Sequence, residues 1–200
     1  MTSEGAYLSE AEQRTLLKVA RDSVTAAVCH TTFEKPPPTE NLTRKFGVFV
    51  TLHRYGDLRG CLGRFEANHT PLIDLVEIMA RESALNDTRF RPVSPDEIDE
   101  LDIEISVLTP MRRVNSPDEV EVGKHGLYII GPSPMGGKRH GTLLPQVATE
   151  HGWDRTTFLE HTARKAGLSP DAWKDKETEI FVYEAQVFGE KDLGLWPPKK

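Results

Sequence analysis

The hexapeptide Leu58-Arg59-Gly60-Cys61-Leu62-Gly63 brings a thiol, a guanidinium and two glycines together within six residues. A cysteine thiolate is a nucleophile, and a neighbouring cation such as Arg59 favours that ionised form. Gly60 and Gly63 carry no side chain, so a ligand could approach the backbone beside Cys61. A packing role fits equally well, because free cysteine is often buried as a small apolar residue and strand glycines mark bulges or close helix contacts. The residue types alone leave both interpretations open.

Hydrophobic alternation predicts that this hexapeptide lies on a β-hairpin formed by residues 47–53 and 58–65. A three-residue turn at Tyr55-Gly56-Asp57 would pair Leu52 with Gly60 and align the apolar positions on one face. His53 would then lie directly across from Arg59. Four side chains would share this second face: Thr51, His53, Arg59 and Cys61.

Two further residues are candidates for the same site. Glu104 stands on a predicted half-buried strand at 101–107 and could act as a general acid or base, with a solvated or ion-paired carboxylate as the alternative. Arg89 could hold a carboxylate or phosphate, or could form a structural pair with Asp87. The polar loop that contains Asp87, Arg89 and Phe90 follows a predicted buried helix directly. We therefore expect it to form the rim of a pocket near the hexapeptide.

Other motifs support chemistry less well. The seven histidines include no His-Glu-x-x-His pattern and no tight His/Asp cluster, so we predict neither a metal nor a cofactor. The loop at 131–141 could hold an anion through backbone amides and Lys138, Arg139 and His140, with a plain surface loop as the alternative. Cys29, at the end of an amphipathic helix, is expected to be structural or incidental.

The elements that must position these residues predict an α+β fold. Helices are expected at 9–29, 70–85 and 154–166, and strands at 47–53, 58–65, 101–107, 127–130 and 179–188. Ser94-Pro95-Asp96-Glu97 and Ser116-Pro117-Asp118-Glu119 each read as a capping box with proline at the first helical position. The strands come in hairpins and not in strict β–α–β alternation, which favours antiparallel sheet. Both halves combine short strands with helices, which leaves an internal duplication open.

Composition narrows the class of protein. Two hundred residues with 38% hydrophobic residues suffice for one domain, or for one domain folded as two lobes. A net charge of −6 argues against bulk binding of nucleic acid or of an anionic membrane. No apolar run reaches membrane-spanning length, and the first residues lack the basic and apolar segments of a signal peptide. Two cysteines rule out a disulfide framework, so we expect a cytoplasmic protein with reduced thiols.

The hexapeptide resembles the Leu-Arg-Gly-Cys-Ile-Gly signature of the AMMECR domain family. The resemblance continues through residues 47–52, 87–92, 103–108, 123–126, 144–147, 152–154 and 165–168, in the order of the family. Departures are Leu62 for isoleucine, Thr88 where the family often has proline, and the loop at 131–141. The resemblance implies a single domain at 9–190, with tails at 1–8 and 191–200. It also implies two unequal lobes around antiparallel sheet, with the hexapeptide strand facing a cleft between them.

The biochemical role of that family is unsettled, so two hypotheses remain. In the first, the chain is an enzyme: Cys61 is a nucleophile or thiol acid/base, Arg59 and Arg89 hold a small anionic substrate, and Glu104 or His125 moves protons. In the second, it is a non-catalytic module that presents the same site to a ligand or protein. The family's prokaryotic members are grouped with a Memo-like protein, akin to extradiol dioxygenases, and a radical-SAM protein in the AmmeMemoRadiSam system. The resemblance thus implies those partners.

Overall fold

The computed structural model describes residues 8–133 and 136–196. Most of the expected N-terminal tail, Pro134 and Met135 of the glycine-rich loop, and residues 197–200 therefore lie outside the described part. The helices and strands form two compact units. The first comprises the described residues up to Leu108 and from Gln186 onward, and the second comprises Thr109 to Ala185.

The first unit contains one four-stranded sheet with the strand order β2-β1-β3-β8. Its central strand β1 is antiparallel to both β2 and β3, so β2, which carries Cys61, is an edge strand. The elements are α1 (Glu10–Cys29), η1 (Asn41–Thr43), β1 (Gly47–Arg54), β2 (Asp57–Arg64), α2 (Leu72–Leu85), η2 (Pro95–Glu100), β3 (Leu101–Leu108) and β8 (Ala185–Gly189).

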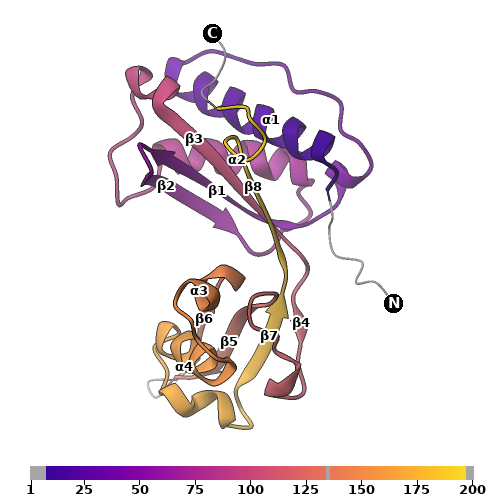
Figure 1. Cartoon of the computed structure of the whole chain (residues 1–200), viewed down its shortest axis with the longest axis vertical. Helices are drawn as coiled ribbons and strands as arrows, with labels where there is room; N and C mark the ends of the chain where they lie inside the picture. Colours follow the sequence, from indigo (N-terminus) through magenta and orange to yellow (C-terminus); the bar gives the residue numbers. More distant parts are fainter. Residues whose placement is uncertain (1–7, 134–135, 197–200) are drawn as a thin grey trace. The chain divides into compact units, whose positions relative to one another are not determined.

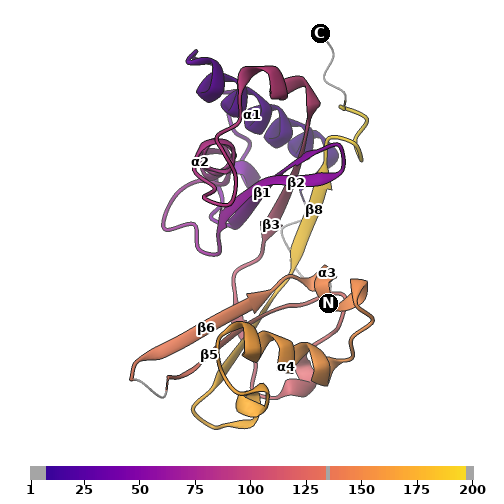
Figure 2. The same ribbon diagram turned by 90° about the vertical axis from the view of Figure 1, so that its left-hand side faces the viewer.

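Helices α1 and α2 lie together on one side of this sheet (Figures 1 and 2). Helix α1 starts where Ser9 and Glu12 close the expected capping box. The apolar positions of β1 face the helices, and Val48, Val50 and Leu52 are fully buried. Successive side chains of a strand point to opposite faces, so Phe49, Thr51 and His53 lie on the face turned away from the helices.

The second unit contains a four-stranded sheet with the order β4-β7-β5-β6, and β5 is antiparallel to β6 and β7. Phe158, Ile129 and Val182 belong to its separate core. Helix α4 ends at Lys165, and Gly167, two residues further on with a φ of +71°, is the predicted stop signal. The elements are β4 (Arg112–Arg113), η3 (Pro117–Glu119), β5 (Gly126–Pro132), β6 (Lys138–Leu143), α3 (Pro145–Glu150), α4 (Arg155–Lys165), η4 (Pro170–Lys174) and β7 (Glu179–Tyr183).

The predicted α+β class, with antiparallel sheet and two unequal units, is confirmed. Both Ser-Pro-Asp-Glu capping boxes form, although each begins a short 3-10 turn and not an α-helix. Trp196 anchors the end of the described chain by donating its indole N–H to the carbonyl of Leu101 at 2.7 Å. Within the described ranges, no helix has the length and apolar character needed to cross a membrane. The internal duplication stays a prediction.

Candidate functional site

The turn that joins β1 to β2 is shorter than expected. Only Tyr55 and Gly56 form it, with φ values of +55° and +92°, as in the two-residue turns whose twist matches that of a hairpin. Leu52 pairs with Gly60 as predicted, but the register shifts between Leu52 and His53, so His53 lies opposite Leu58. The expected pairing of His53 with Arg59 is therefore wrong, because a bulge absorbs the extra residue.

A row of polar side chains crosses three strands on the face turned away from the helices. Thr51 lies opposite Cys61 of β2 on one side and opposite Glu104 of β3 on the other. The Thr51 hydroxyl donates to the Cys61 Sγ atom across 3.2 Å. All three residues are half-buried. The predicted face is confirmed for Thr51 and Cys61, whereas the predicted pair His53–Arg59 does not form; Glu104 adds a carboxylate in register with Thr51.

The backbone of Cys61 is held by two side chains from the loop after α2. Its N–H donates to Asp87 Oδ2 at 2.9 Å, and its carbonyl accepts from Arg89 Nη2 at 3.1 Å. An edge strand leaves such groups without a neighbouring strand, so this pair of side chains closes the open edge at Cys61. The prediction that Asp87 and Arg89 lie beside the hexapeptide is confirmed.

Asp87 and Arg89 also form a bidentate ion pair, with N–O distances of 2.9 and 2.7 Å. The Arg89 guanidinium, with desolvation opposing it, holds the pKa of Asp87 far below its ordinary value. Asp87 in turn raises the pKa of Arg89, with desolvation opposing it. The Arg89 side chain remains 54% exposed, with its guanidinium 5.4 Å from the ring centroid of Phe90. It is therefore a fixed cation, open to solvent, beside the cysteine.

Arg59 has a different task from the one expected. Its Nε and Nη2 atoms donate to the two carboxylate oxygens of Glu97, each at 2.9 Å, and Nη1 donates to the carbonyl of Arg91 at 2.9 Å. Arg54 donates to the same carboxylate at 2.9 Å. The Arg59 side chain is only 13% exposed, so its hydrogen-bonding capacity is used within the fold and not offered to a substrate.

The two glycines of the hexapeptide do not leave open space for a ligand. A Cβ atom at Gly60 would lie 2.3 Å from the carbonyl oxygen of Ser83, so this glycine allows α2 to approach the sheet. A Cβ atom at Gly63 would lie 2.4 Å from the ring of Phe49, its cross-strand partner. The expectation of an open approach beside these glycines is therefore wrong, because a helix backbone and an aromatic ring occupy the two places.

Ser83 is a buried residue whose role the sequence did not indicate. Its hydroxyl donates to the carbonyl of Val50 and accepts from the N–H of Leu62, both at 2.8 Å. Val50 and Leu62 are cross-strand partners, so the hydroxyl stands within the β1–β2 ladder. The one signal for this contact in the sequence is that Ser83 falls on the apolar, buried side of α2, where a polar side chain needs a hydrogen-bond partner.

His125 belongs to the second unit, whereas Cys61, Glu104 and Arg89 belong to the first. It is 5% exposed, and its Nδ1 atom accepts from the N–H of Glu121 at 3.0 Å. Burial lowers the pKa of His125 from its ordinary value. These contacts describe a neutral histidine that closes a local turn. Within residues 8–133 and 136–196, no three His, Cys, Asp or Glu side chains are grouped so that they could hold a metal ion.

The fold and this site define a class: a two-unit α+β protein in which a cysteine on an edge strand is held by an Asp-x-Arg loop. The AMMECR1 family model matches residues 17–188, so the chain belongs to the AMMECR1 family. It is 45% identical to Protein MK0488 of Methanopyrus kandleri over 80% of this chain and 78% of the relative. It is 42% identical to a protein of Methanothermobacter thermautotrophicus, and this match covers 92% of this chain and 97% of the relative.

A solved structure extends the comparison to three dimensions. The crystal structure of uncharacterized protein PH0010 from Pyrococcus horikoshii aligns with a TM-score of 0.75 at 35% sequence identity. The alignment covers 92% of this chain and 94% of that one. This chain and PH0010 therefore share their fold.

Proposed function

We propose that this AMMECR1-family protein is a thiol-centred enzyme in which Cys61 attacks a small anionic substrate held at Arg89. The observation that carries the proposal is the row formed by Cys61, Thr51 and Glu104, with the exposed Arg89 guanidinium bonded to the Cys61 backbone. A hydroxyl donor and a nearby cation both stabilise negative charge on sulfur. Arg89 is the substrate-binding cation of this proposal, because Arg59 is committed to Glu97.

The chemical step that suits this arrangement is acyl transfer through the thiol. The Cys61 proton is transferred to the Glu104 carboxylate while the Thr51 hydroxyl donates to the sulfur, and an S–C bond forms to the acyl carbon of the substrate. The bond to the leaving group breaks, and Glu104 returns the proton to that group. Water then cleaves the thioester and restores the thiol. From the sequence, either Glu104 or His125 could move protons; this proposal assigns the role to Glu104, which lies in register with Thr51 on the sheet that carries Cys61.

Alkylation tests the proposal without knowledge of the substrate, and Cys29 serves as an internal control because it is an exposed thiol in the same chain. We expect Cys61 in the folded protein to prefer anionic iodoacetate over neutral iodoacetamide, relative to Cys29, by roughly fivefold. Arg89→Gln should abolish the preference, and Thr51→Val should slow both reagents. Peptide mass spectrometry after timed quenching measures both sites together.

A second candidate function is a non-catalytic module, favoured by the occupied spaces at Gly60 and Gly63 and by the use of both Cys61 backbone groups within the fold. Under that reading, folded Cys61 resists both reagents and Cys61→Ser retains full activity in the cellular pathway. That pair of results would reject the enzyme. The Memo-like and radical-SAM partners and the cytoplasmic location also remain proposals, and co-purification of the tagged chain from its own cells tests the partners.

A further inference from the structure

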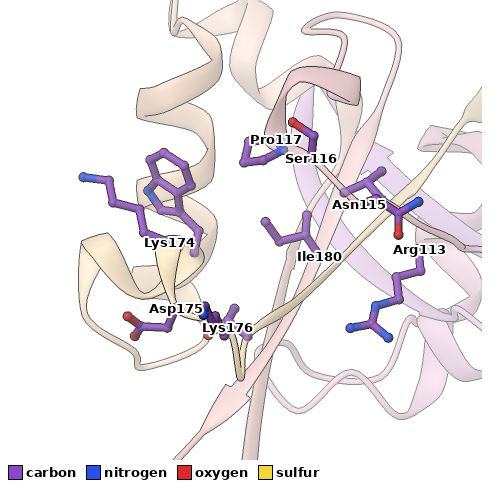
Figure 3. A pocket seen from close by; sticks show the side chains of 11 residues that line it. Arg113, Asn115, Ser116, Pro117, Lys174, Asp175, Lys176 and Ile180 are labelled. Carbon is purple, nitrogen blue, oxygen red and sulfur yellow. The ribbon is translucent and has the colours of Figure 1, made fainter.

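The proposed reaction contains one step to which no side chain is yet assigned: the attack of water on the thioester at Cys61. That water must give up a proton, so the step requires a base within reach of the sulfur. A pocket of about 300 Å³ in the second unit, between the segments at 113–117 and 173–180 (Figure 3), is lined by no histidine and by no residue of the thiol site. The strands around Cys61 themselves carry a candidate.

Cys61 has two diagonal neighbours on β1. Its cross-strand partner is Thr51, and the residues two positions before and after Thr51 on the same face are Phe49 and His53. Residues in such diagonal positions are about 7–8 Å apart, which leaves room for a water molecule between a group on the sulfur and an imidazole ring. The Phe49 ring occupies one of these two sides, because it covers Gly63. His53 stands on the other side.

His53 is suited to accept a proton. The residue is half-buried, and in the part of the chain that the structure describes its ring has no hydrogen-bond or ion-pair partner. A neutral imidazole has one nitrogen that accepts a hydrogen bond and one that donates. One ring nitrogen of His53 can therefore bind water while the other donates to a carboxylate.

Asp102 provides such a carboxylate. It lies directly opposite His53 in the regular pairing of β1 with β3, so the Cβ atoms of the two residues are about 4.5–5.5 Å apart on one face of the sheet. Its Oδ2 atom forms an ion pair with Lys191 at 2.8 Å, whereas its Oδ1 atom is buried without a partner. Buried acceptors are nearly always satisfied, and the imidazole N–H of the adjacent strand is a donor of the right kind. Hydrogen bonds between catalytic groups often close only when substrate is bound.

We propose that His53 is the general base of the hydrolytic step and that Asp102 positions its ring; this inference rests on the proposed function. His53 removes a proton from water, whose oxygen bonds to the acyl carbon of the thioester. The C–S bond then breaks, and the proton passes from the imidazolium to the Cys61 sulfur. The products are a carboxylic acid and the free thiol. Glu104 retains the proton transfer of the first step.

Mono-p-nitrophenyl adipate is a suitable probe, because it joins an activated ester to a carboxylate that Arg89 can hold. Cys61 should take the adipoyl group with release of p-nitrophenolate, whose absorbance gives the rate of acylation. After gel filtration removes excess probe, peptide mass spectrometry follows the loss of the acyl group from Cys61. We expect His53→Gln to be acylated at the parental rate and to keep the acyl group about 100-fold longer. His151→Gln changes an exposed histidine of the second unit and should behave as the parent does.

A second pair of variants tests the positioning role of Asp102. Asp102→Asn should be acylated at the parental rate and should keep the acyl group roughly tenfold longer, because a misplaced base is less effective. Lys191→Met breaks the same ion pair but leaves the carboxylate in place, so it should lose the acyl group as fast as the parent. This comparison separates the positioning of His53 from a merely structural ion pair, and circular dichroism checks that each variant is folded.

Two results would overturn the inference. One is loss of the acyl group from His53→Gln at the parental rate, and the other is equal slowing by Asp102→Asn and Lys191→Met. Both leave Cys61 acylated, so the thiol-centred enzyme survives them. If the probe does not acylate Cys61 at all, the proposed function itself fails, together with the inference that rests on it.

Discussion

Glu97 offers the sharpest test of how the hexapeptide strand is fixed, because its carboxylate joins two arginines to a capping box. It accepts from Arg59 and Arg54 and from the backbone N–H of Ser94. The pKa of Glu97 falls from 4.5 to about 2. The hydrogen bond from Arg59 is the largest cause, desolvation opposes it, and the hydrogen bonds from Ser94 lower the pKa further. That depression corresponds to about 3 kcal/mol of folding free energy at neutral pH. Solvent around the partly exposed Arg54 reduces the expected value to about 2 kcal/mol.

The pH dependence follows from the sign of this shift. Because the pKa of Glu97 is lowered in the folded state, its stabilisation is complete above about pH 4.5 and disappears as the pH falls towards 2. Glu97→Gln should therefore be about 2 kcal/mol less stable than the parent at pH 7. At pH 3 the gap should shrink to less than half of that.

Urea denaturation followed by circular dichroism at pH 7, 5 and 3 measures this gap. Glu100→Gln is the matched control, because Glu100 lies on the same 3-10 turn and pairs with Arg54 but not with Arg59. Glu100→Gln should destabilise the protein clearly less than Glu97→Gln does, because its ion pair is exposed to solvent. The reasoning is refuted if the two variants are equally stable at pH 7, or if the loss in Glu97→Gln does not diminish with acid.

Three further outcomes are expected. Gly60→Ala should destabilise the protein by about 2–3 kcal/mol in thermal or urea unfolding, because its Cβ atom would lie 2.3 Å from a backbone oxygen of α2. Ser83→Ala should cost about 1–3 kcal/mol and should speed hydrogen exchange at the Leu62 amide, which loses its acceptor; unchanged exchange would contradict the bridging role. Because burial lowers the pKa of His125, the protein should lose stability as the pH falls below the ordinary histidine pKa of about 6.5. His125→Gln should lack that loss, and NMR titration of the His125 ring should show protonation only at lower pH.

Local signals predicted much of the fold. The Ser9–Glu12 capping box, the proline at Pro71 before α2 and the glycine after α4 each depend on a few neighbouring residues, and each marks an element end in the structure. Alternation of apolar residues placed β1 and β3 with the correct face towards the helices. These features are set by backbone geometry and burial within one element, so one sequence suffices to find them.

The predictions for the site were wrong at contacts between two different elements. The turn depends on Tyr55 adopting a left-handed conformation, which its residue type does not announce, and the resulting bulge moved His53 away from Arg59. Sequence alone indicates that Gly60 and Gly63 have a specific role in the strand. It does not show why a side chain is excluded there, because the atoms that exclude it belong to α2 and to Phe49. Glu97 was recognised as a capping residue, whereas its pairing with Arg59 joins positions 38 residues apart. Tertiary partners of this kind leave no trace in local spacing.

Asp87 and Arg89 bear on both candidate functions, because they hold the Cys61 backbone and also place a charge beside its thiol. An edge strand needs partners for its outward N–H and carbonyl groups, and this pair provides both at Cys61. Closing the edge with side chains and not with another strand leaves a charged guanidinium, 54% exposed, beside the thiol. The guanidinium neutralises the buried Asp87 carboxylate, which the structural closure already requires. Its exposed part is not needed for that closure, and it is this part that a substrate anion would use under the proposed function.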